Sequence, residues 1–364
     1  MAGAAQGQEA LRGCAGRRLA GVEKKKGEMS AVEGDYQAII LGGGQSGLAT
    51  AYYLLRAGVQ TVVLDDQEAP GGAWRHAWPS LRLFSPANAS NLPGMMMPSY
   101  PGFPSASHVV DYFTKYEQRY SIPVERPVRI VTVTKEAGRF VLSDAKDERW
   151  SADCLIVATG TWSAPFVPHY PGDFAGKQWH TANYPGAEPF KGQKVAVVGG
   201  GNSGAQIAAE LTKVADVTWF TRREPRFMPD DVDGRVLFRR NRERLNAMMK
   251  GEADPGPESQ LGDIVAVEDV REARDAGELV AEEMVGSLDQ IEADHLIWCT
   301  GFRPAVNPVR DLLDGMTPTV EGMFMVGYGE SVGPGAATIT GVSPFAKRAA
   351  QNAVSYLNKQ YKVF

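Results

Sequence analysis

Two glycine-rich loops, each set between a short apolar run and a segment of helical composition, constrain the fold of this chain most strongly. The first, Gly42-Gly43-Gly44-Gln45-Ser46-Gly47, follows the apolar run 36–41 and precedes the helical segment 48–57. A second apolar run, 61–64, ends at Asp65, about 20 residues after the loop begins. Strand, G-x-G-x-x-G, helix, strand and acid together form the fingerprint of a dinucleotide-binding βαβ unit.

Each residue of the first loop has an expected role. In such a loop the first glycine makes a tight turn, the second lets the backbone approach a pyrophosphate, and the third lets helix and strand pack closely. We assign these roles to Gly42, Gly44 and Gly47. Gln45 and Ser46 lie in the loop and are also expected to bind the cofactor, and the N–H groups at the N-terminus of the helix that follows would face the phosphates. The acid after the second strand is expected to accept hydrogen bonds from the ribose.

The second loop repeats the pattern with a different cofactor preference. Gly199, Gly201 and Gly204 occupy the three glycine positions, in a loop that is followed by a helical segment, 205–214, and a strand, 217–220. Asn202 and Ser203 lie in this loop and are also expected to bind the cofactor. Where the first unit has its acid, the second has a pair of arginines, Arg222 and Arg223.

The arginine pair indicates a phosphorylated coenzyme. An acid at that place would repel a 2′-phosphate, whereas a guanidinium can bind it through two hydrogen bonds. The sequence therefore predicts FAD at the first loop and NADPH at the second. An arginine pair that is simply exposed at the surface is the alternative.

Two apolar strands that end in Thr-Gly, 155–160 and 296–301, suggest how the domains are joined. In flavoproteins with two dinucleotide sites, such segments carry the chain out of the flavin domain and back, so Gly160 and Gly301 are expected beside a cofactor. The fold class expected is α/β, with two dinucleotide-binding Rossmann-like domains. The NADPH domain is inserted into a discontinuous FAD domain; the expected bounds are 1–34 for a disordered N-terminal extension, 35–164 plus 294–364 for the FAD domain, and 165–293 for the NADPH domain.

Composition and charge exclude several other classes of protein. The formal net charge of −5 over 364 residues leaves no broad basic face for nucleic acid. Three cysteines without a C-x-x-C pair exclude a disulfide framework and a thioredoxin-reductase type of thiol relay. No apolar run reaches about 18 residues, so no membrane span is expected, and we predict a cytoplasmic protein. The acids of 230–233 lack the spacing of a calcium loop, and no metal site is expected.

A resemblance to a known family comes from motifs outside the two loops. The segment 174–185, FAGKQWHTANYP, resembles the F-x-G-x-x-x-H-x-x-x-[FWY]-P signature of class B flavin monooxygenases. Gly71-Gly72-Ala73-Trp74 is similar to the family's Gly-Gly-x-Trp. The runs 83–86 and 231–238 resemble the short bacterial flavoprotein monooxygenases, and the resemblance covers about residues 35–360.

This resemblance implies an activity, its cofactors and its partners. FAD and NADPH are the cofactors, and a small molecule and O2 are the substrates. Hydride would pass to flavin N5, oxygen would add at C4a, and the peroxyflavin would oxygenate a sulfide, an amine or a ketone. Neither nucleic acid nor a membrane is an expected partner, and a homodimer is one option for assembly.

The resemblance also implies roles for individual residues. Gly72 and Trp74 would lie along the flavin, and His180 would be a structural or hinge residue of the linker, with acid–base catalysis as the alternative. Thr338 or Thr340 would face the flavin ring, at the N-terminus of a helix that begins near residue 342.

Phe84 stands where larger members of the family commonly have an asparagine. A phenyl ring offers no hydrogen bond, so we expect peroxide leakage and slow sulfoxidation. The alternatives are that Phe84 simply packs in the core and that Asn88 or Asn91 supplies the polar group.

Three other functions remain open at this stage. One is an NAD(P)H:flavin reductase or oxidase that produces hydrogen peroxide. Another is an enzyme that oxidises organoarsenicals, because similar sequences have been labelled arsenic-resistance monooxygenases. The third is a nucleotide-sensing protein without turnover.

Overall fold

The computed structural model describes residues 32–361. The N-terminal extension predicted for 1–34 therefore lies outside the described residues, apart from 32–34, which belong to the first strand. No helix within the described range is both long and apolar enough to cross a membrane.

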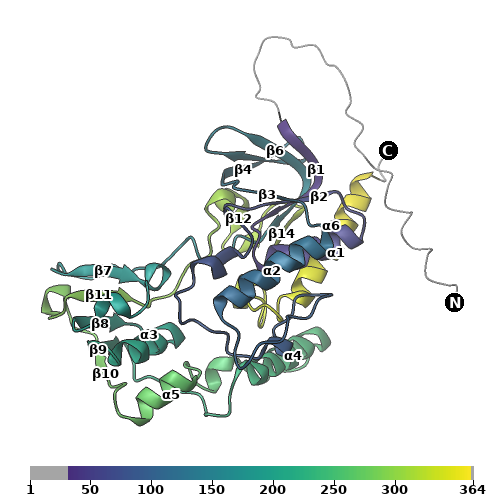
Figure 1. Ribbon diagram of the computed structural model, residues 1–364. Coiled ribbons are helices and arrows are strands. Elements are labelled where there is room, and N and C mark those ends of the chain that lie inside the picture. Colours follow the sequence, from purple (N-terminus) through teal and green to yellow (C-terminus); the bar gives the residue numbers. More distant parts are fainter. Residues whose placement is uncertain (1–31, 362–364) are drawn as a thin grey trace, which may run out of the picture. The chain divides into compact units, whose positions relative to one another are not determined.

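The first sheet has seven strands in the order β3-β2-β1-β6-β5-β4, with β14 paired to β6 (Figure 1). Strands β1, β2, β3, β6 and β14 pair in parallel, whereas β4, β5 and the first half of β6 form an antiparallel meander. The strands are β1 (Val32–Leu41), β2 (Thr61–Leu64), β3 (Val124–Glu125), β4 (Ile130–Glu136), β5 (Arg139–Asp144), β6 (Arg149–Val157) and β14 (Met323–Met325).

The first sheet is buried on both faces, because β1 has apolar side chains on each of them. Ile40 packs into one core cluster with helices α1 (Gln45–Arg56), α2 (Ala106–Tyr120) and α6 (Ser343–Tyr361). Its neighbour Ile39 points to the opposite face, because successive side chains alternate along a strand. Helices α1 and α6 lie side by side (Figure 1).

The second sheet has five strands, all parallel, in the order β10-β9-β8-β11-β7. These strands are β7 (Lys177–His180), β8 (Lys194–Val198), β9 (Asp216–Thr221), β10 (Ala281–Glu283) and β11 (His295–Trp298). Helix α3 (Asn202–Thr212) packs against α5 (Glu268–Asp275) and β9 over an apolar core. Helix α4 (Gly234–Lys250) follows β9, and a two-stranded sheet joins β12 (Leu313–Asp314) to β13 (Thr317–Pro318).

The α/β class with parallel sheets is confirmed, and one strand differs from its predicted place. Strand β11 lies inside the range 294–364 that was predicted for the first domain, yet it pairs with β7 and β8 in the second sheet. The reason is that β6 in the first sheet and β11 in the second sheet occupy equivalent positions, so their sequences look alike. Each is the buried parallel strand beside the strand that leads into a glycine-rich loop.

Candidate dinucleotide-binding sites

The first glycine-rich loop is held tightly where β1 enters α1. Gly42 has a φ of +102°, and a Cβ there would lie 2.5 Å from the carbonyl oxygen of Ala158. A Cβ on Gly47 would collide with the carbonyl oxygen of Gly42. At Gly44, by contrast, a Cβ would meet nothing within 4 Å. The loop is therefore closed toward the protein and open on the side where a phosphate can approach.

Helix α1 begins without a side-chain cap. The N–H of Leu48 donates to the carbonyl of Gly44 at 3.0 Å, and the N-cap Gly44 has no side chain to accept from the N–H groups of residues 45–47. Uncapped N–H groups and the positive end of the helix dipole together favour an anion. Helix α1 begins at Gln45, so Gln45 and Ser46 lie in its first turn rather than in the loop before it.

A cavity of about 690 Å³ runs along the first loop. Its walls include Gly42, Gly44, Gly72, Gly160 and Ala337. This volume lies within the range of about 300–1,000 Å³ that is typical of small-molecule sites. The first loop thus opens onto a space that is large enough for a bound ligand.

Gln45 connects this loop to two other segments. Its Oε1 accepts a hydrogen bond from the indole Nε1 of Trp74 at 3.0 Å, and its Nε2 donates to the carbonyl of Ala337 at 2.7 Å. Both predicted residues, Gln45 and Trp74, therefore belong to one polar contact at the edge of the cavity.

Asp65 is buried and held by an arginine that the sequence did not reveal. Arg126 Nε donates to Asp65 Oδ2 at 2.6 Å, and the other two guanidinium nitrogens donate to Glu117 at 2.7 and 2.9 Å. No side-chain donor among residues 32–361 contacts Oδ1 of Asp65. This oxygen can therefore accept a further hydrogen bond.

The second loop repeats the geometry of the first. Gly199 has a φ of +141°, and a Cβ there would collide with the carbonyl of Cys299. A Cβ on Gly204 would collide with Gly199, whereas at Gly201 it would meet nothing within 4 Å. Helix α3 also begins without a side-chain cap, and its first helical bond joins the N–H of Ala205 to Gly201 at 3.1 Å.

Residues beside the second loop have distinct contacts. Asn202 Oδ1 accepts from the N–H of Val265 at 2.8 Å, so it anchors a neighbouring segment, and Ser203 follows it in the first turn of α3. Arg222 and Arg223 follow β9 and are exposed. Within residues 32–361, neither guanidinium makes a hydrogen bond or an ion pair.

The segments that contain Gly160 and Gly301 run antiparallel to each other. Gly301 accepts from the N–H of Phe166, and Gly160 accepts from the N–H of Ala305, each at 2.9 Å. Both glycines have positive φ, +65° and +79°. They therefore turn the chain in a conformation that other residues rarely adopt.

His180 fixes the second of these turns. Its Nδ1 accepts from the N–H of Ala182 at 3.0 Å, which leaves Nε2 to donate to the carbonyl of Gly301 at 3.1 Å. Burial lowers the pKa of His180 below its usual 6.5, so the ring is neutral near pH 7. Both ring nitrogens of His180 are therefore used within the protein, which favours the structural role expected for this residue.

Comparison with known proteins identifies the family. Residues 39–324 match the family described as pyridine nucleotide-disulphide oxidoreductase. The solved flavin-containing monooxygenase from Stenotrophomonas maltophilia is 40% identical, with a TM-score of 0.78, over 88% of this chain and 99% of that one. The chain belongs to this oxidoreductase family, among the flavin monooxygenases.

Two curated relatives extend the comparison. The uncharacterized oxidoreductase CzcO of Bacillus subtilis is 28% identical over 336 residues, which cover 84% of this chain and 96% of the relative. The indole-3-pyruvate monooxygenase YUCCA1 of Oryza sativa is 36% identical over 212 residues, or 55% of this chain and 51% of the relative. These comparisons confirm the predicted family. They also confirm the predicted cofactors, because flavin monooxygenases use FAD and NADPH.

The hydroxyls of Thr338 and Thr340 make hydrogen bonds within the protein. Thr338 Oγ1 donates to Gly335 and accepts from Gly341, each at 2.9 Å. Thr340 Oγ1 accepts from the N–H of Asn91 at 3.0 Å and donates to its carbonyl at 3.2 Å. Their neighbour Ala337 lines the large cavity, whereas neither threonine does.

Phe84 is half-buried and packs against Met228, Val232, Leu237 and Val265. Its carbonyl accepts from the N–H of Gly234 at 2.9 Å, where α4 begins. It is not among the residues that line the large cavity. The contacts favour the packing role that was left open, and a role in catalysis stays a prediction.

Proposed function

We propose that this chain is an FAD- and NADPH-dependent monooxygenase that oxygenates small soft nucleophiles, such as sulfides to sulfoxides, or ketones. The observation that carries this proposal is the pair of glycine-rich loops, 42–47 and 199–204, each of which forms a cradle for a phosphate group. The first cradle opens onto the 690 Å³ cavity. Each cradle ends in an uncapped helix, α1 or α3, which suits a pyrophosphate.

The first cradle fits FAD. Gly44 and the start of α1 would hold the pyrophosphate, and Asp65 Oδ1 would accept from the ribose. Gly72, whose backbone lines the cavity, and Trp74 would hold the flavin end. When bound and reduced, FAD reacts with O2 and supplies the oxygen atom for the substrate.

The second cradle fits NADPH. Gly201 and the start of α3 would hold its pyrophosphate, and Arg222 with Arg223 would bind the 2′-phosphate. We place the NADPH domain at about residues 165–298, because β11 pairs within the second sheet. The remaining described chain would form the FAD domain.

The two described cysteines argue against a disulfide reductase. Cys154 lies in β6 of the first sheet, whereas Cys299 directly follows β11 of the second. Both are buried, and burial raises the pKa of each thiol to about 12. A thiol that reacts with a disulfide must be accessible and partly ionised, and neither cysteine meets that condition.

One experiment tests the proposal. The purified protein is expected to be yellow, to bleach with NADPH without air, and to form sulfoxide from methyl phenyl sulfide in air. Chromatography measures the sulfoxide, and a peroxidase assay measures hydrogen peroxide in the same sample. Consumption of NADPH with peroxide as the sole product would support the oxidase instead, and a folded protein that binds no FAD would exclude both.

A further inference from the structure

A second cavity, of about 340 Å³, lies along one face of α4. Arg235, Phe238, Arg239 and Arg242 form its helical wall, and the loop 88–91 and Thr340 form the other. The four α4 residues are spaced i, i+3, i+4 and i+7, which places them on a single face of the helix. Three of the four carry a positive charge.

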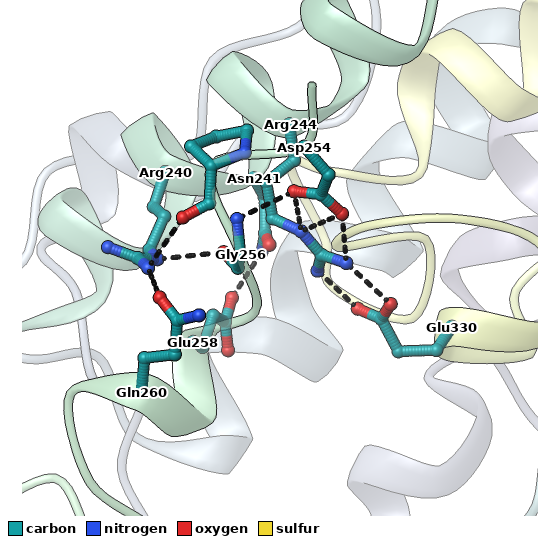
Figure 2. A network of polar contacts seen from close by, with 9 residues as sticks. Arg240, Asn241, Arg244, Asp254, Gly256, Glu258, Gln260 and Glu330 are labelled. Carbon is teal, nitrogen blue, oxygen red and sulfur yellow. Dashed lines mark hydrogen bonds and ion pairs between the residues drawn. The ribbon is translucent and has the colours of Figure 1, made fainter.

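The other arginines of α4 are already paired. Arg244 lies between Asp254 and Glu330 (Figure 2). Its guanidinium nitrogens lie 2.8–3.3 Å from their carboxylate oxygens. Arg240 donates to the carbonyls of Gly256 and Pro255 at 3.0 and 3.2 Å. These contacts fix the helix on its neighbours and leave the opposite face toward the cavity.

The cavity face retains unpaired positive charge. Arg235 is paired with Asp233, which caps α4. Arg239 and Arg242 are exposed, and within residues 32–361 neither guanidinium makes a hydrogen bond or an ion pair. Phe238, half-buried on the same face of α4, offers an apolar surface. The wall therefore combines two available cations with one aromatic ring.

The opposite wall connects this cavity to the predicted flavin site. Asn91 uses its amide within its own loop, accepting from the N–H of Met97 and donating to the carbonyl of Asn88, each at 2.7 Å. Its backbone is bound to Thr340, three residues after Ala337, which lines the large cavity and accepts from Gln45. The turn 337–340 thus borders both cavities.

We propose that this face of α4 binds the carboxylate of an acidic organic substrate whose apolar body rests on Phe238. The inference deepens the proposed function and rests on it, since it names the substrate class of the same monooxygenase. Arg239 and Arg242 supply the planar donors that a carboxylate accepts. Because single exposed ion pairs are weak, both arginines are needed.

The test compares two sulfides that differ in charge, phenylthioacetate and methyl phenyl sulfide. Their affinities for the FAD-loaded protein are measured by calorimetry without NADPH, in the wild type and in the double variant Arg239→Gln/Arg242→Gln. The double variant should bind phenylthioacetate about tenfold more weakly and bind methyl phenyl sulfide unchanged. Wild-type affinity for phenylthioacetate should also fall with added salt.

A matched control is Arg348→Gln, which removes an exposed arginine of α6 that lines neither cavity. It should bind both sulfides as the wild type does. Unchanged affinity for phenylthioacetate in the double variant, an equal loss in the control, or no binding to the wild type would each overturn the proposal. Because binding is measured without turnover, a failure of the proposed oxygenation shows up separately, in the sulfoxide assay.

Discussion

Arg126 Nε lies 2.6 Å from Oδ2 of Asp65, and this contact extends to the glycine-rich loop. A Cβ added to Gly43 would lie 2.5 Å from the same oxygen and 2.7 Å from Nη2 of Arg126. Glu117 holds that guanidinium from its other side, so it cannot easily move. The buried ion pair therefore requires a glycine at position 43, between the first two glycines of the fingerprint. In the second loop, a Cβ on Gly200 would meet only Thr221, at 3.5 Å.

This difference predicts opposite results for one substitution in the two loops. Gly43→Ala should displace Asp65 or the loop, and the purified protein should contain less than about a tenth of the wild-type FAD. Gly200→Ala is the matched control, because 3.5 Å is ordinary contact, and its Michaelis constant for NADPH should change less than about twofold. Absorbance near the flavin maximum measures the first, and initial rates measure the second. Full FAD content in Gly43→Ala would show that the ion pair does not constrain the loop.

Arg222→Ala tests the coenzyme preference of the second site. The side chain is exposed and has no partner within residues 32–361, so it is available for a 2′-phosphate. Loss of hydrogen bonds to a charged group should raise the Michaelis constant for NADPH about tenfold to a hundredfold. NADH lacks the 2′-phosphate, so its constant should hardly change. Equal losses with both coenzymes would assign Arg222 another role, and Arg223→Ala would show whether the neighbour shares it.

The features that sequence predicts well here are local ones. The glycine positions follow from the strand–loop–helix order, because each glycine is constrained by residues a few positions away or by the adjacent strand. Arg126 was missed because its partner, Asp65, is distant in sequence and nothing near Arg126 marks it. Helix α4 was missed because its composition is rich in charge, although Asp233 caps its start and Gly251 its end.

Contacts between distant segments also decide what surrounds Thr340 and β11. Thr340 was expected beside a flavin, but its hydroxyl is bound to Asn91, which lies on a loop before α2. Strand β11 could be assigned to either sheet from its sequence, because both sheets use an apolar strand that ends in Thr-Gly. Only pairing with β7 and β8 distinguishes the two.

The low pKa of His180 predicts how stability depends on pH. Above about pH 6.5 the ring is neutral in both the folded and the unfolded chain. As the pH falls through 6.5, the unfolded chain binds a proton that the folded protein, with its lowered pKa, does not, so the free energy of unfolding decreases. In His180→Gln the amide can still donate to Gly301 but cannot titrate. The melting temperature of the wild type should therefore fall more steeply than that of the variant between pH 7.5 and 5.5. Parallel curves for the two proteins would contradict this assignment.

Substitutions of Phe84 distinguish a packing role of this side chain from a role in catalysis. Phe84 packs against the cluster that includes Met228, Val232 and Leu237, so an amide in its place would lack apolar contacts and leave a polar group partly buried. Phe84→Asn should lower the free energy of unfolding by about 1–3 kcal/mol, whereas Phe84→Leu should lower it by less than about 1.5 kcal/mol. Denaturant unfolding measures both, and the share of NADPH that ends as hydrogen peroxide is measured alongside. Packing predicts an unchanged share of peroxide in Phe84→Leu, since the leucine preserves the apolar contacts. A Phe84→Asn variant that is as stable as the wild type and leaks less peroxide would instead place this side chain at the reaction site.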